Sequence, residues 1–212
     1  MKFSETFGEM IAHFLIMIEI VRGMTINQKC QTPINILSAK GAYIEPLQKS
    51  RVRIDSLKKP FGNGHALSFD FKTTSLSGVL FYLNNANTKE FVGVEIASGF
   101  LTYHIKCRRL EAVLTVAAAK VDDGKWHSIV YRRKRKRGRL IVDGKHYFQN
   151  YRIACDNEGF ASMTLGGIHP VDIDFVDSFE GKTGHFEGCI KNVDNTAGIL
   201  TLPKYTGVSE CE

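Results

Sequence analysis

Beyond residue 42 the chain is divided into short apolar segments by turn dipeptides, and this pattern restricts the fold more than any other feature. Apolar and polar side chains alternate along residues 65–72, as expected of a strand with one buried face. Residues 78–84 form a continuous apolar run, which indicates a strand buried on both faces. Turn dipeptides such as Asp143-Gly144 end several segments. No helical period is present, so we expect an all-β sandwich.

The strands that we expect are each five to ten residues long. Within them, Val92, Val94 and Ile96 should share one face, and so should Leu101, Tyr103 and Ile105. The expected strands cover residues 65–72, 78–84, 91–97, 100–106, 110–116, 127–133, 138–144, 160–167, 184–193 and 198–202.

One short segment accounts for the basic character of the protein. The chain of 212 residues has 28 Lys and Arg against 22 Asp and Glu, a net charge of +6. Seven basic side chains lie within residues 132–139, which we call the basic run: Arg132, Arg133, Lys134, Arg135, Lys136, Arg137 and Arg139. Without these seven, 21 basic residues face 22 acidic ones, a net of −1. The charge is therefore a local feature.

The basic run connects two expected strands, with Gly138 in the turn between them. A hairpin tip would direct the side chains into solvent, where their mutual repulsion still costs stability. A long anionic partner relieves that repulsion, and guanidinium groups bind sulfate and carboxylate oxygens in pairs. We therefore predict a polyanion-binding tip. Lys106, Arg108 and Arg109, in a neighbouring segment, could widen it.

Three other interpretations of the basic run compete with this one. A charge run can be a solvated face, although six consecutive cations exceed what such a face needs. A nuclear-localisation or nucleic-acid patch has a similar composition, but few aromatic residues are interleaved here. Residues 132–135 would also suit a basic-directed processing protease, which is compatible with anion binding.

Residues 1–23 differ from the rest of the chain. The apolar stretch at residues 10–23 is interrupted by His13 and Glu19, and it is too short to span a bilayer comfortably. We interpret residues 1–23 as a possible signal peptide or leader, residues 24–41 as a linker and residues 42–212 as the folded domain. The alternative for the first segment is a piece of a longer chain, such as an amphipathic helix.

Several motifs in order give the chain a family resemblance. The segments are GVLFYLNN at residues 78–85, DDGKWHSIVYRR at 122–133 with LIVDG at 140–144, MTLGGI at 163–168 and FEGCIKNV at 186–193. Together they resemble the laminin G-like domain of laminin α chains, neurexins, agrin and perlecan, from about Ala42 to Cys211. The resemblance implies a jelly-roll sandwich of two antiparallel sheets, secreted into the extracellular matrix or basement membrane, with function in the loops at the rim.

The five cysteines are scattered and form no zinc-binding pattern, which fits an oxidising compartment. The resemblance implies a disulfide between Cys189 and Cys211. The pairing of the other three stays open: Cys107 and Cys155 could join each other, and Cys30 could bond a preceding module or another chain.

The resemblance also implies a possible calcium site at the rim, because many members hold one ion with two acidic or amide side chains and main-chain carbonyls. The first ligand position falls on Glu90 and the second in the segment that holds Asp156, Asn157 and Glu158. Glutamate in place of aspartate shifts the ligand oxygen, within the tolerance of a flexible calcium shell. The alternative is a set of exposed loop acids.

Catalytic interpretations are weaker than structural ones. Trp126 is expected to anchor the core, and His127 to be partly buried and bonded to main chain. Residues 172–177, with Asp172 first, loosely resemble the acidic motif of jelly-roll glycoside hydrolases. That motif has glutamates at its ends, and retaining chemistry needs the two carboxyl groups about 5 Å apart, so aspartates would open the gap. We expect a polar surface loop there, and a protein that is not an enzyme.

These observations lead to one functional prediction and one alternative. We predict an adhesion module that binds heparan sulfate or related acidic glycans through the basic run, with dystroglycan-type receptors as further candidates and no nucleic acid. The alternative is a calcium-dependent module of neurexin type that binds a protein receptor.

Overall fold

The computed structural model describes residues 34–47, 49–148, 152, 153, 155, 159–175, 179 and 186–211. They belong to one compact unit, Ile34–Glu212. None of the helices formed by these residues has the length and apolar character needed to cross a membrane. The possible leader at residues 1–23, most of the expected linker and Cys30 lie outside the described residues.

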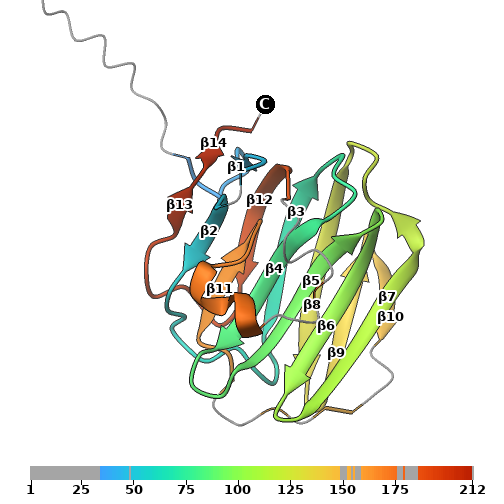
Figure 1. Ribbon diagram of the computed structural model, residues 1–212, viewed down its shortest axis with the longest axis vertical. Coiled ribbons are helices and arrows are strands. Elements are labelled where there is room, and N and C mark those ends of the chain that lie inside the picture. Colours follow the sequence, from blue (N-terminus) through green and yellow to red (C-terminus); the bar gives the residue numbers. More distant parts are fainter. Residues whose placement is uncertain are drawn as a thin grey trace, which may run out of the picture. The chain divides into compact units, whose positions relative to one another are not determined.

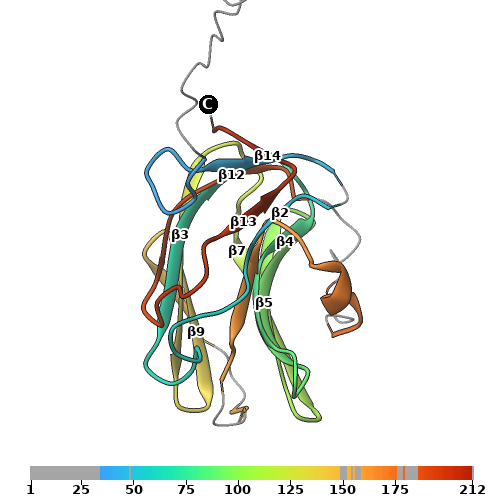
Figure 2. The same ribbon diagram turned by 90° about the vertical axis from the view of Figure 1, so that its left-hand side faces the viewer.

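The unit is a jelly-roll sandwich of two antiparallel sheets, as the sequence predicted. Figure 1 shows the strands and Figure 2 shows the two layers facing each other. Sheet 1 has the strand order β10-β9-β8-β3-β12-β1-β14, and sheet 2 the order β13-β2-β11-β4-β5-β6-β7. The strands are β1 Ala42–Ile44, β2 Arg51–Ile54, β3 Ala66–Lys72, β4 Gly78–Asn85, β5 Glu90–Ala97, β6 Phe100–Cys107, β7 Leu110–Lys120, β8 Trp126–Lys134, β9 Arg137–Val142, β10 Lys145–Phe148, β11 Ser162–Leu165, β12 Gly188–Asn195, β13 Lys204–Thr206 and β14 Val208–Ser209.

The alternating residues of β3, β5 and β6 pack between the two sheets as predicted. Leu67, Phe69 and Phe71 of β3 are all buried in the main core. The predicted triads of β5 and β6 lie in the same core. Burial of a large aliphatic or aromatic side chain contributes roughly 1.5–3 kcal/mol, so these positions fix which face of each strand points inward.

Strand β4 is buried on both faces, which confirms the interpretation of its continuous apolar run. Its outer face lies in a second apolar cluster that contains Val79 and Tyr82 of β4, Phe91 of β5 and Phe179. The 3-10 helix η1, Pro170–Phe175, lies on the outer side of sheet 2 (Figure 2). This cluster and η1 therefore cover part of the outer face of sheet 2.

Residues ahead of β1 also pack into the domain: Ile36 is fully buried and its carbonyl accepts the N–H of Val193 at 3.1 Å. One expected strand is absent from the described residues. Residues 198–202 do not form a strand: Ile199 makes only an isolated bridge to Leu57. Strands β13 and β14 follow instead.

Two disulfides fasten loops to the sheets. Cys189 in β12 pairs with Cys211, as the family resemblance implied. Cys107, at the end of β6, pairs with Cys155, which resolves the pairing that the sequence left open. The second bond holds the chain segment after β10 against the end of sheet 2.

Candidate anion-binding site

The basic run forms the tip of the β8–β9 hairpin. The turn is Arg135–Lys136, and Lys134 pairs with Arg137 across the strands. Arg135 has a φ of +55°, and its N–H donates to Asn63 Oδ1 at 2.7 Å, which helps to hold this strained conformation. The prediction that Gly138 lies in the turn was wrong: it lies in β9, opposite Arg133.

The alternation of β8 and β9 sends the basic side chains to opposite sides of sheet 1. Arg132, Lys134 and Arg137 are exposed on the outer face, and Arg139 is half-buried there. The register places Arg132 opposite Arg139 and Lys134 opposite Arg137. Like charges directly opposite each other destabilise a sheet by roughly 0.2–1 kcal/mol per pair. Two such pairs in succession are a structural cost at this tip.

A groove of about 770 Å³ lies over this outer surface. Phe148 and Gly138 complete its lining, and none of its described lining residues is acidic. We call it the basic groove, and its cations are Arg132, Lys134, Arg135, Lys136, Arg137, Arg139 and Arg152. Within the part of the chain that the structure describes, no carboxylate oxygen lies within 4 Å of a basic-run nitrogen. No carboxylate of the described residues therefore relieves their repulsion.

Arg152 belongs to the groove although it follows the basic run by more than ten residues. The Ile153 N–H donates to the Lys136 carbonyl at 3.0 Å, and Arg133 Nη2 donates to the Ile153 carbonyl at 3.0 Å. The disulfide at Cys155 fixes the same segment from the other side. Sequence reasoning missed Arg152, because nothing in the local pattern places this segment against the tip.

Phe148 supplies the apolar wall of the groove. Strand β10 pairs with β9 so that Phe148 lies opposite Arg139, and the Arg139 guanidinium carbon is 5.1 Å from the centre of the ring. Arg139 also contacts His146, which lies on β10 with Phe148. A cation over an aromatic face is attracted to it, so this guanidinium is oriented before any ligand arrives.

Arg133 does not reach the solvent as the prediction required, because it shares the inward face of β8 with Tyr131. It is 5% exposed, and its Nη1 has no hydrogen-bond partner among the described atoms. Burial raises the pKa of Tyr131, and the nearby Arg133 guanidinium acts in the opposite direction. Burying a cation without a carboxylate partner is costly. Because Arg133 is buried, it contributes positive potential to the tip but makes no direct contact with solvent.

Arg108 and Arg109 do not widen the basic groove. They form the turn between β6 and β7, in sheet 2, and neither they nor Lys106 line the groove. Their charges therefore belong to another part of the surface, and the residue that extends the site is Arg152 instead.

The predicted calcium ligands fall only partly within the described residues. Glu90 begins β5, is 1% exposed, and accepts a main-chain N–H from the β6–β7 turn at 3.0 Å. The sulfur atoms of Cys107 and Cys155 lie within 4.8 Å of it, but they are joined in a disulfide. Asp156 and Asn157 lie outside the described residues. Calcium takes six to eight oxygen ligands, and Glu90 is the one predicted ligand among the described residues, so the calcium site stays a prediction.

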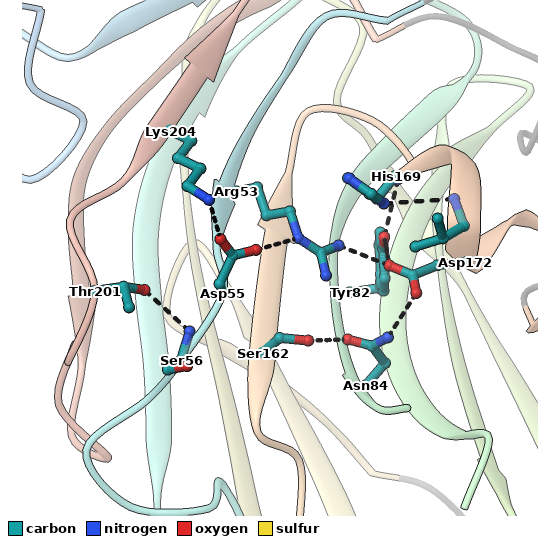
Figure 3. A network of polar contacts seen from close by, with 11 residues as sticks. Arg53, Asp55, Ser56, Tyr82, Asn84, Ser162, His169, Asp172, Thr201 and Lys204 are labelled. Atoms are coloured by element: carbon teal, nitrogen blue, oxygen red, sulfur yellow. Dashed lines mark hydrogen bonds and ion pairs between the residues drawn. The ribbon is translucent and has the colours of Figure 1, made fainter. Parts of the chain in front are cut away.

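The segment compared with glycoside hydrolases is not a surface loop at its first residue. Asp172 is 2% exposed and binds three donors: Tyr82 Oη at 2.6 Å, Arg53 Nη1 at 2.8 Å and Asn84 Nδ2 at 3.0 Å (Figure 3). Burial, followed by the Asp172 charge, raises the pKa of Tyr82, so the phenol stays a donor. These bonds attach η1 to sheet 2, and we call them the Asp172 network. Asp177 lies outside the described residues.

The prediction that Trp126 anchors the core was wrong, because β8 turns its even-numbered residues outward. His127 is partly buried as predicted, but its partners differ from the main-chain partner that we expected. Trp126 is 39% exposed, and Lys191 Nζ lies 3.8 Å from its ring centre. His127 binds carboxylates rather than main chain, with Nδ1 2.8 Å from Asp143 and Nε2 3.1 Å from Asp123. Burial lowers the pKa of His127, but these partners outweigh it, and the pKa lies above its ordinary value.

Comparisons with known proteins agree with this architecture. A family model for the laminin G domain matches residues 71–196, more than half of the chain. The laminin subunit alpha of Drosophila melanogaster is 27% identical over 175 residues, which cover 78% of this chain and 5% of that protein. Mouse laminin subunit alpha-4 is 25% identical over 172 residues, or 76% of this chain and 9% of the relative. The chain thus spans a small part of these relatives.

A solved structure of laminin domains has the same fold. Domains LG4-5 of the mouse laminin alpha1 chain superpose with a TM-score of 0.62 over 89% of this chain and 51% of that one. The sequence identity is 15%, so this likeness concerns the fold alone.

Proposed function

Because this chain belongs to the laminin G domain family, we propose that it is an extracellular binding module that attaches to heparan sulfate or related acidic glycans through the basic groove. It acts as an adhesion module in the matrix and not as an enzyme. The glycan lies along the outer face of the β8–β9 hairpin, where Arg132, Lys134 and Arg137 contact its sulfate and carboxylate groups.

The observation that carries this proposal is the unrelieved charge of the groove. Seven cations line it, no described lining residue is acidic, and two like-charged pairs face each other across β8 and β9. A polyanion stabilises such a surface by matching its charge and by releasing its own condensed counter-ions. That binding needs no deep cavity, and it weakens steeply as salt rises.

Arginine dominates the groove, which favours sulfate and carboxylate as the bound groups. Five of its seven cations are arginines, whose planar guanidinium forks bind two oxygens of one anion at once. Arg139, already stacked on Phe148, presents such a fork at little further entropic cost. A chain of acidic sugars supplies anions in series along the groove.

Retention on immobilised heparin tests the proposal. The parent domain should elute above physiological salt, and Lys134→Gln/Arg137→Gln, which removes two exposed groove charges, should elute much earlier. Lys40→Gln/Lys49→Gln is the matched control, because both lysines are exposed and neither lines the groove. If the two double variants elute together, retention reflects net charge and the site assignment is wrong.

Calcium-dependent binding to a protein receptor is the alternative function. Of its expected ligands, Glu90 lies among the described residues, buried at the start of β5. Receptor binding that survives high salt and disappears in EDTA would favour this alternative. Heparin retention that is unchanged by EDTA would favour the glycan.

A further inference from the structure

A second hollow lies on the other side of the same hairpin. Its volume is about 790 Å³. The polar residues of its lining include Lys59, Asn63, His65, Arg133, Arg135 and Lys136. No acidic residue is among its described lining. We call it the inner hollow. It shares Arg135 and Lys136 with the basic groove, and it adds Lys59, from outside the basic run, and Arg133, from the inward face of β8.

Hydrogen bonds fix the wall of the inner hollow to the hairpin. The Gly64 N–H donates to the Arg133 carbonyl at 2.9 Å, and the Arg133 N–H donates to the His65 carbonyl at 3.2 Å. Asn63 Oδ1 accepts the Arg135 N–H at 2.7 Å. These bonds hold the turn that follows Lys59 beside the tip, and so they set the inner hollow next to the basic groove.

Arg133 makes the inner hollow more than a group of surface lysines. Its guanidinium forms part of the wall, is more than nine-tenths buried, and has an Nη1 atom without a partner among the described residues. No described carboxylate pairs with it. A buried charge is screened less than an exposed one, so it raises the positive potential of the hollow that it borders.

The two hollows meet at the tip, because Arg135 and Lys136 line both of them. A cationic path therefore runs from the outer face of β8 and β9, over the turn, to Lys59. We propose that a single acidic glycan chain crosses the hairpin tip and occupies the basic groove and the inner hollow together, with Lys59 as a binding residue. This inference rests on the proposed function and adds the length and the path of the ligand.

The proposal explains why the tip carries two solvent-exposed cations on a strained turn. A chain confined to one hollow would need charges on one face only. A chain that crosses the turn contacts Arg135 and Lys136 at the crossing point and places later anionic groups near Lys59 and Arg133. Long glycans should therefore bind more tightly than short ones. The gain should exceed what their additional contacts in the basic groove provide, because they also reach the inner hollow.

Isothermal titration with heparin oligosaccharides of two lengths tests the crossing. A tetrasaccharide should bind in the basic groove alone, and a dodecasaccharide should reach both hollows. Lys59→Gln should weaken dodecasaccharide binding roughly fivefold and lower its salt slope by about one ion, while tetrasaccharide binding stays unchanged. Lys59 is exposed, so this change should not disturb folding. Lys40→Gln is the matched single-charge control.

The outcomes separate the inference from the proposed function. If the parent does not bind either oligosaccharide at physiological salt, the proposed function fails and the crossing fails with it. If the parent binds but Lys59→Gln behaves like Lys40→Gln toward the dodecasaccharide, only the crossing is overturned. Equal weakening of both lengths also overturns it, because a short chain in the groove does not reach Lys59. Weakening of the dodecasaccharide alone supports it.

Discussion

Two clusters of charged side chains in this domain differ in whether their charges are paired. In the Asp172 network every charge has a partner: Asp172 accepts from Arg53, Tyr82 and Asn84, and Arg53 also donates to Asp55 at 2.6 Å. In the basic groove, seven cations face one another with no described carboxylate in the lining. The first cluster uses its charge to hold η1 on sheet 2. In our proposal the second leaves its charge for a ligand.

The largest effect should come from breaking the paired cluster. Asp172→Ala removes the buried acceptor of Tyr82 and Asn84 and leaves Arg53 with Asp55 alone, which should lower the free energy of unfolding by about 3 kcal/mol. Urea unfolding measures this loss of stability. Dodecasaccharide affinity should stay within about twofold of the parent, because Asp172 does not line the groove. Loss of binding in a folded Asp172→Ala protein would show that the two clusters are coupled.

Removing charge from the unpaired cluster should act on binding instead. Lys134→Gln/Arg137→Gln should weaken dodecasaccharide binding roughly 25-fold at physiological salt, about 1 kcal/mol for each lost charge near a polyanion. Titration calorimetry gives the affinity, with Lys40→Gln/Lys49→Gln as the control of equal charge. An affinity equal to that of the control would place the glycan elsewhere.

The same double variant should make the free domain more stable. It removes one like-charged cross-strand pair, so the free energy of unfolding should rise by about 0.5 kcal/mol at low salt. The gain should shrink in 1 M salt, where screening already reduces the repulsion. Urea unfolding at the two salt concentrations measures this. A loss of stability at low salt would mean that these cations have internal partners.

An effect of similar size on stability is expected at His127, whose carboxylate partners are exposed. Its folded-state pKa is raised, so its stabilising interaction is fully present below the ordinary histidine pKa and is lost as pH rises through the raised value. Stability should fall by about 0.5 kcal/mol over that range, because Asp123 and Asp143 are solvent-exposed. Unfolding at about pH 5.5 and about pH 8.5 tests it. Asp143→Asn should flatten the change, and an unchanged slope would exclude this pair as the cause.

Local alternation predicted most of the fold and part of the site. The period of two correctly placed the inward residues of β3, β5 and β6. Carried along β8 from Ile129 and Tyr131, the same period puts Arg133 inside and Trp126 outside, so a signal for both corrections was present in the sequence. The outward residues of the basic run follow the same rule. Their exposure was predictable because the strand pattern alone decides it.

The rest of the site depends on contacts between distant segments. Arg152 reaches the groove through hydrogen bonds to Lys136 and Arg133, and no local pattern marks that approach. Lys59 reaches the inner hollow through a turn that is bonded to the end of β8. Asp172 likewise collects its donors from β2 and β4. Tertiary packing sets these positions, so a single sequence does not predict them.

The central claim is that the basic groove holds unrelieved charge that a linear polyanion neutralises. The most direct test is the affinity of a heparin dodecasaccharide measured by calorimetry over a series of salt concentrations. A steep linear fall of log K with log salt, reduced by about two ions in Lys134→Gln/Arg137→Gln but not in Lys40→Gln/Lys49→Gln, is the expected result. A flat salt dependence in the parent, or equal slopes in all three proteins, would contradict it.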